Sequence, residues 1–256
     1  MNLITKLVAV VLLAVVAFMF GGNQHRTGGW PFGHSVFVGV TRASDDERKK
    51  EREEEREALP WIEKLKKGGY LIYLRHANRE KWPDNVTFDV YEFVNKIADA
   101  NQSSFKRAVC LSEQGVEEAK MLGQTFKLFK IPTGTIVSSP SCRAKQTASY
   151  AFGRFDYVED SLLFPDFRLK DQPKGSPERL VDFLKHVEIK AGTNTIIAGH
   201  GSILEFLEKG AIEGNTSGLR ETGFHIIERQ GDNKLVIVFT FKSMGDLSIY
   251  GMKSLK

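Results

Sequence analysis

Short apolar runs alternate with amphipathic stretches along most of the chain after residue 69. Residues 70–74, 135–137 and 195–198 have the length and composition of buried strands. Residues 111–127 have the periodicity of a helix, and Ser176-Pro177 is a typical start for another helix that runs towards His186. The apolar runs 236–241 and 247–250 are expected to be closing strands. This alternation predicts one α/β domain, which is large enough to bury a substantial core.

Basic side chains follow the three buried runs, at the point where each strand is expected to end. Arg75 and His76 close the first run, Arg143 follows the second, and His200 follows the third between two glycines. The carboxyl ends of parallel strands share one edge of a sheet, so these four residues can meet there although they are distant in sequence. Two imidazoles and two guanidiniums form a cationic site that suits a tetrahedral oxyanion such as phosphate.

These residues resemble the motifs of the histidine phosphatase superfamily, the phosphoglycerate mutase-like proteins, which carry an Arg-His pair after the first strand. The segment Leu111-Ser112-Glu113-Gln114-Gly115 resembles the start of the family's second helix, and residues 138–148 (SSPSCRAKQTA) resemble its second arginine segment. The likeness covers residues 69–250. It implies a three-layer α/β/α fold with a mostly parallel central sheet.

The chemistry that we expect is attack by His76 on a phosphate monoester, which gives a phosphohistidine that water then hydrolyses. Arg75 and Arg143 would hold the phosphoryl oxygens, and their charge would oppose protonation of the nearby imidazole. His200 would donate a further hydrogen bond to the phosphoryl group. Arg79 either binds further anionic groups of the substrate or lies in a solvated loop. The expected partner is a small phosphorylated substrate.

The leaving group needs a proton, which family members supply from an acidic residue after the second-arginine helix. Asp166 is our first choice because it follows an apolar run and a proline, Asp171 is the reserve, and Glu221 is a more distant possibility. Two other functions stay open. A phosphomutase would pass the phosphoryl group to a second hydroxyl, and a phosphoryl-binding module would keep the site without turnover.

Several other chemistries do not fit the sequence. A cysteine phosphatase needs Arg six positions after its Cys, but Ala148 stands there after Cys142 and Val116 after Cys110. A serine hydrolase needs Ser between the two glycines, where this chain has His200. The zinc and Walker motifs are absent from the sequence, so we expect no metal and no cofactor.

The first 20 residues contain a continuous apolar run from Leu7 to Phe20. It has the length of a signal-peptide core, or of a marginal membrane anchor if Leu3 and Ile4 are included. Because a clean cleavage site is missing, we favour an anchor slightly over a cleaved signal peptide. Lys6 would stay in the cytoplasm, which places the catalytic domain in the periplasm or another extracytoplasmic space.

Residues 21–57 are expected to form a glycine-rich linker and a charged helix, and residues 58–256 the catalytic domain. Within that domain, the aromatic-rich segment 81–107 is interpreted as a lid or substrate wall. The two cysteines, Cys110 and Cys142, could pair in an oxidising compartment, but free thiols are the default expectation. A net charge of only +4, with acidic and basic residues mixed, does not indicate nucleic-acid binding. The sequence gives no prediction of oligomeric state.

Overall fold

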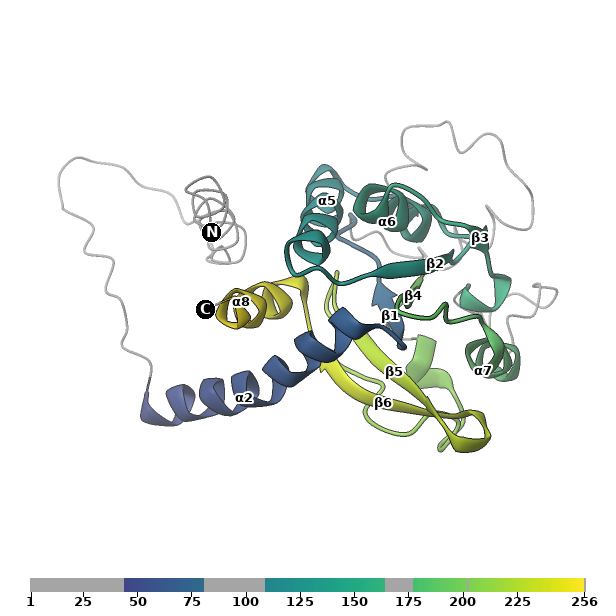
Figure 1. Cartoon of the computed structure of the whole chain (residues 1–256). Helices are drawn as coiled ribbons and strands as arrows, with labels where there is room; N and C mark the ends of the chain where they lie inside the picture. The colour runs from purple at the N-terminus through teal and green to yellow at the C-terminus, as the bar shows by residue number, and fades with distance from the viewer. Residues whose placement is uncertain (1–43, 81–108, 164–176, 202, 256) are drawn as a thin grey trace, which may run out of the picture. The chain divides into compact units, whose positions relative to one another are not determined.

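The computed structural model describes residues 44–80, 109–163, 177–201 and 203–255 (Figure 1). Contacts divide the chain into two units, residues 1–51 and 52–256. The described part of the first unit is the beginning of helix α2 (Asp45–Lys67), which Ser44 caps by accepting a hydrogen bond from the Glu47 N–H at 3.2 Å.

Six strands form one sheet in the order β3-β2-β4-β1-β5-β6. Their bounds are Leu71–Arg75 for β1, Thr133–Ser138 for β2, Tyr157–Val158 for β3, Asn194–Gly199 for β4, Phe224–Gln230 for β5 and Lys234–Phe241 for β6. Strands β3, β2, β4 and β1 pair in parallel, while β5 pairs antiparallel with both β1 and β6. The mostly parallel sheet that we predicted is confirmed.

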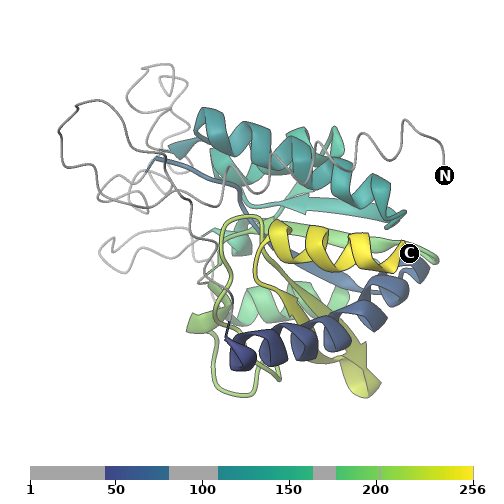
Figure 2. The ribbon, with the colours of Figure 1, turned by 90° about the vertical axis from the view of Figure 1, so that its left-hand side faces the viewer.

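Helices cover both faces of this sheet. Helices α5 (Glu113–Leu128) and α6 (Cys142–Phe152) lie side by side on one face, and α7 (Pro177–His186) lies on the other, as Figures 1 and 2 show. The chain ends in α8 (Met244–Ser254). The described residues also include three short 3-10 helices, at Asp160–Leu162 (η1), Ile203–Phe206 (η2) and Gly231–Asn233 (η3).

Alternate strand residues pack against opposite layers. Tyr73 and Ile197 point into a core that also contains Leu180 and Leu184 of α7. The intervening strand residues are equally buried and lie outside that cluster, among them Ile72, Leu74, Ile136 and Ile196. Burial on both faces explains why these strands appear in the sequence as continuous apolar runs instead of alternating ones.

Most of the predicted elements are present, with three differences. The run 247–250, which we expected to be a strand, belongs to α8. Ser243 accepts a hydrogen bond from the Asp246 N–H, and the Asp246 carboxylate accepts one from the Ser243 N–H at 3.2 Å, so a capping box starts a helix there. Strands β3 and β5 were not predicted. The charged helix does not end by residue 57 as expected but continues through Pro60 to Lys67, as α2.

Several expectations lie outside the described residues. They concern the membrane segment and linker, the proposed lid at 81–107, and the acid candidates Asp166 and Asp171. Within the described ranges, no helix is long and apolar enough to cross a membrane.

Candidate active site

The carboxyl ends of β1, β2 and β4 meet at one edge of the sheet. Arg75 is paired with Gly199, and the next residue, His76, donates its backbone N–H to the Gly199 carbonyl at 3.1 Å. On the other side of β4, the Ser139 N–H donates to the Ala198 carbonyl at 2.8 Å. Strand β4 thus brings the residues that follow the first and second strands to either side of His200.

The ring of His76 has one nitrogen occupied by the backbone. Nδ1 lies 2.8 Å from the carbonyl oxygen of Ala77, and since a carbonyl only accepts, Nδ1 carries the proton of this bond. In the neutral ring the lone pair is therefore on Nε2. The side chain is 4% exposed, and its ring centroid lies 5.5 Å from that of His200.

His200 is held through both ring nitrogens. Its Nδ1 accepts a hydrogen bond from Nη2 of Arg143 at 3.1 Å, so the proton of the neutral ring is on Nε2. That nitrogen lies 3.1 Å from Oγ of Ser139 and 3.3 Å from Oγ of Ser141. These contacts fix the plane of the ring beside His76.

Arg143 lies in the first turn of α6. Ser141 is the N-cap, and its hydroxyl accepts the Ala144 N–H at 3.4 Å. The Arg143 side chain is 3% exposed, which is unusual for arginine. A buried guanidinium at the positive end of a helix makes this part of the site strongly attractive to an anion.

Arg75 approaches from the end of β1. Its Nη1 donates to the carbonyl of Leu219 at 2.5 Å, whereas its buried Nε has no hydrogen-bond partner among the described residues. Gly201 allows this placement, because a Cβ atom there would lie 2.6 Å from Cδ of Arg75. An N–H donor that lacks a protein acceptor suits a bound oxyanion.

The environment keeps both histidines neutral. Burial lowers the pKa of His76 well below its ordinary value, and the charges of Arg143, Arg75 and Arg79 lower it further. Burial and then Arg143 lower the pKa of His200 well below its ordinary value as well. At neutral pH the site therefore combines uncharged imidazoles with charged guanidiniums.

The remaining predicted residues are less closely placed. Arg79 is partly buried and donates to the Glu80 carbonyl at 3.0 Å, and its charge reaches both histidines. Glu221 accepts a hydrogen bond at 3.1 Å from Nδ2 of Asn78, which is two residues after His76 in the chain. Among the described residues, no group of three His, Cys, Asp or Glu side chains could hold a metal ion.

Sequence reasoning missed the residues that hold the loop after β1. Oγ1 of Thr147 accepts the Ala77 N–H at 3.0 Å and donates to the Arg143 carbonyl at 2.7 Å, so it joins the loop after β1 to α6. The available signal in the sequence was that Thr147 lies four residues after Arg143, a spacing that makes two residues neighbours on a helix. Oδ1 of Asn78 accepts from the hydroxyl of Ser112, the N-cap of α5, at 2.7 Å.

Cys110 and Cys142 form a disulfide, so the expectation of free thiols was wrong. The fold explains the pairing: Cys110 precedes α5, Cys142 is the first residue of α6, and the two Cα atoms lie 4.9 Å apart. This separation is within the range that a disulfide can span. The bridge is adjacent to Arg143 and ties the amino ends of the two helices together.

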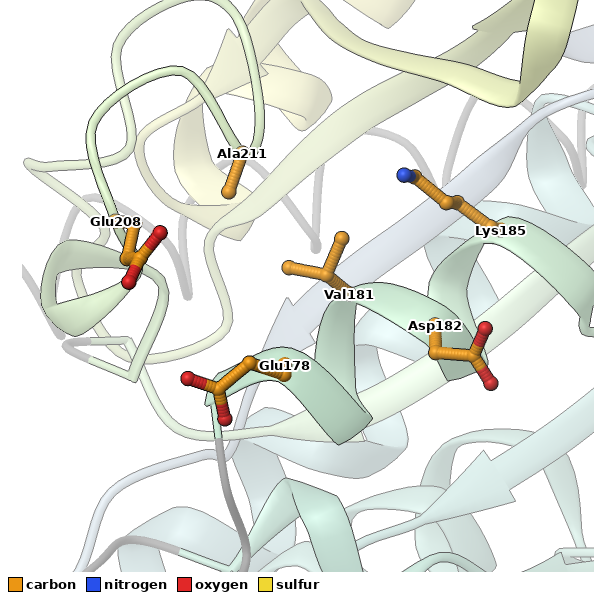
Figure 3. A pocket seen from close by; sticks show the side chains of 6 residues that line it. All are labelled: Glu178, Val181, Asp182, Lys185, Glu208 and Ala211. Atoms are coloured by element: carbon orange, nitrogen blue, oxygen red, sulfur yellow. The ribbon is translucent and has the colours of Figure 1, made fainter.

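A separate pocket of about 340 Å³ lies beside α7, away from these residues (Figure 3). Its lining is Glu178, Val181, Asp182, Lys185, Glu208 and Ala211. Three carboxylates against one ammonium give it a negative charge, which disfavours a phosphorylated ligand. The cationic strand ends remain the better site for an anion.

The sequence matches no family model and no curated protein. Solved structures do match. The protein histidine phosphatase SixA, complexed with tungstate, is 13% identical over 70% of this chain and 99% of its own, with a TM-score of 0.48. Phosphoserine phosphatase from Entamoeba histolytica, in complex with 3-phosphoglyceric acid, is 16% identical over 67% of this chain and 95% of its own, with a TM-score of 0.41. At these identities the matches are likenesses of fold.

Proposed function

We propose that this protein is a phosphatase that hydrolyses a phosphate monoester through a covalent phosphohistidine on His76. One observation carries the proposal. The Nδ1–H of His76 is bound by the Ala77 carbonyl, which leaves the Nε2 lone pair of a neutral, buried ring beside Arg143 and His200. A nucleophilic nitrogen next to fixed positive charge is the arrangement that attack on a phosphoryl group requires.

In the first step, Nε2 of His76 forms a bond to phosphorus while the ester P–O bond breaks. Arg143 and Arg75 neutralise the charge on the phosphoryl oxygens, and one of these oxygens can take the place of the serine hydroxyls as the acceptor of the His200 Nε2–H. The leaving alkoxide takes a proton from a general acid, for which Asp166 is our candidate, with Asp171 and Glu221 as alternatives. In the second step, water gives a proton to the same carboxylate as it attacks phosphorus, the P–N bond breaks, and inorganic phosphate leaves.

The test is to incubate the purified full chain with an activated aryl phosphate, quench in alkali, and look for phosphohistidine by mass spectrometry while released phosphate is measured. We expect an adduct on His76 and turnover, both lost in His76→Ala. His186→Ala is the matched control, because His186 lies exposed on α7. Binding of phosphate without adduct or turnover would contradict the proposal and favour a binding module. Transfer to an added alcohol in place of release would favour a phosphomutase.

We also propose that the catalytic domain lies outside the cytoplasm, attached to the membrane by the apolar segment 7–20. The Cys110–Cys142 disulfide supports this placement, because disulfides persist in oxidising compartments and are rare in the cytosol. The test is to digest intact cells or spheroplasts with protease and to follow the domain by immunoblot. Degradation without lysis is expected, whereas protection until lysis would contradict the placement.

A further inference from the structure

The peptide unit between Ala77 and Asn78 contacts a functional group on each side. Its carbonyl oxygen accepts the Nδ1–H of His76 at 2.8 Å, and its N–H donates to Oε2 of Glu118 at 3.0 Å. Both groups belong to one planar, conjugated amide. Glu118 and His76 are therefore connected by two hydrogen bonds through a single peptide.

Glu118 occupies an uncommon position for a carboxylate. It lies on α5, is 5% exposed, and its second oxygen, Oε1, accepts a hydrogen bond from Nε2 of Gln114 at 2.7 Å. Each oxygen thus accepts from an N–H donor, which favours the ionised form. Burial of a carboxylate costs free energy even with such partners, so the position of Glu118 beside the loop after β1 indicates a functional role.

A glycine in the first turn of α5 allows this helix to approach the loop after β1. Gly115 lies so close to the chain after β1 that a Cβ atom there would be 1.9 Å from the Asn78 carbonyl oxygen. The Ser112 N–H also donates to that oxygen at 3.2 Å. These contacts hold the first turns of α5 against residue 78 and bring Glu118 within reach of the peptide.

We propose that Glu118 is a positioning residue for His76, which acts through the Ala77–Asn78 peptide. This inference rests on the proposed function, in which His76 is the nucleophile. A carboxylate that accepts the Asn78 N–H polarises the amide and makes the Ala77 oxygen a stronger acceptor. The stronger acceptor keeps the proton on Nδ1 and the lone pair on Nε2, as partners behind a functional histidine commonly do. No proton leaves His76 in this arrangement.

The groups around His76 and Glu118 affect two separate properties of the His76 ring, its charge and its tautomer. Burial lowers the pKa of His76, and the charges of Arg143, Arg75 and Arg79 lower it further, so the ring stays neutral beside that of His200. Burial raises the pKa of Glu118, as does the charge of Glu221, while the hydrogen bonds from Asn78 and Gln114 oppose this rise. Burial and the arginines would thus set the charge of the ring, and Glu118 would set which nitrogen carries its proton.

The direct test is ¹⁵N NMR of the histidine rings in the full chain at pH 7, which reports the tautomer without any need for turnover. The variants are Glu118→Gln, which keeps the shape and removes the charge, and Glu117→Gln, which removes an exposed carboxylate one residue away. We expect wild type and Glu117→Gln to show His76 protonated on Nδ1. In Glu118→Gln, the Nδ1 proton signal should move to lower frequency and the second tautomer should appear. An unchanged His76 spectrum in Glu118→Gln would overturn the inference.

Kinetics give a second readout. With an aryl phosphate, Glu118→Gln should lower kcat on the order of tenfold, with KM within about twofold, because the nucleophile changes and the phosphate contacts do not. If wild type releases no phosphate, the proposed function fails while the spectra still decide the role of Glu118. If Glu118→Gln does not fold, a pH titration of the wild-type protein followed by NMR gives the test. On acidification, the signals of the Asn78 N–H and the His76 Nδ1–H should shift with one common midpoint. Separate midpoints would overturn the inference.

Discussion

Arg143 donates a hydrogen bond from Nη2 to Nδ1 of His200 over 3.1 Å, and both side chains are almost fully buried. Because a guanidinium cannot lose its proton, Nδ1 of His200 must be the acceptor of this hydrogen bond. The imidazole must then present its Nε2–H to the serine hydroxyls or to a bound anion. The charge of Arg143 and the tautomer of His200 are consequently one functional unit.

Replacement of Arg143 should remove both parts of this unit. For Arg143→Ala we expect kcat/KM for an aryl phosphate to fall by about 10²- to 10³-fold, as for the loss of one preorganised donor to a transition-state oxyanion. Arg143→Lys keeps the charge but not the fork geometry, and should recover only part of the rate. Lys127→Ala, which removes an exposed cation from α5, is the control. Equal rates for wild type and Arg143→Ala would contradict this role.

The lowered histidine pKa values predict activity at acidic pH. In the proposed mechanism His76 must be neutral to attack, and burial holds its pKa well below its ordinary value of 6.5. The acid limb of the profile of kcat/KM against pH should therefore lie below pH 6.5. Arg143→Gln removes a positive charge that opposes protonation, so the limb should move to higher pH in the residual activity of that variant. A wild-type limb at or above pH 6.5 would count against His76 as the group that titrates.

His225 allows a test of stability that is independent of the site. It is buried, with Nδ1 at 2.7 Å from the Thr240 hydroxyl and Nε2 at 3.2 Å from the Thr216 carbonyl, and burial lowers its pKa from 6.5 to about 4. Below pH 6.5 the unfolded chain binds a proton that the folded chain does not, so stability falls as pH falls from 6.5 towards 4.

Melting temperatures across this range check the sign. His225→Gln should show a shallower loss of Tm between pH 6.5 and 4 than wild type, although His76 and His200 still contribute in the same direction. The same slope in His225→Gln and wild type would refute the assignment.

Substitutions of Thr147 test the link between the loop after β1 and α6. Thr147→Val has the same shape but leaves the Ala77 N–H without its acceptor, which should cost about 1–3 kcal/mol of unfolding free energy. The turnover should fall as well, because Ala77 holds the His76 ring. Thr147→Ser keeps the hydroxyl and should stay near wild type. Denaturant unfolding and phosphate release measure the two effects, and equal stability of the Val and Ser variants would exclude the link.

The disulfide should contribute to stability. The bridge closes a loop between residues separated by 32 positions, which corresponds to roughly 3–4 kcal/mol in the chain-entropy picture. Cys110→Ser, or reduction of the wild-type protein, should lower the Tm, and reductant should have no further effect on the variant. A Tm that does not depend on reductant in the wild type would mean that the bridge is absent in solution.

The sequence was most informative where one geometric rule applies to separate segments. The convergence of His76, Arg143 and His200 was predictable because parallel strands end at a common edge. The run 247–250 was misread because its apolar residues are compatible with either element, and the capping box at Ser243 decides for helix. Glu118 carried no signal, since one acidic residue on a helix looks solvated until the fold brings it to Asn78. The disulfide depended in the same way on the approach of two helix ends.

The place of β4 in the sheet has a consequence for how the protein folds. Strands β1 and β2 precede β4 in the chain but do not pair with each other, because β4 lies between them. A growing polypeptide therefore lacks the strand that joins β1 to β2 until residues 194–199 have been synthesised. Pairings across such sequence distances fold slowly. The active site is consequently a late product of folding, and a chain that ends before β4 would have no site to assemble.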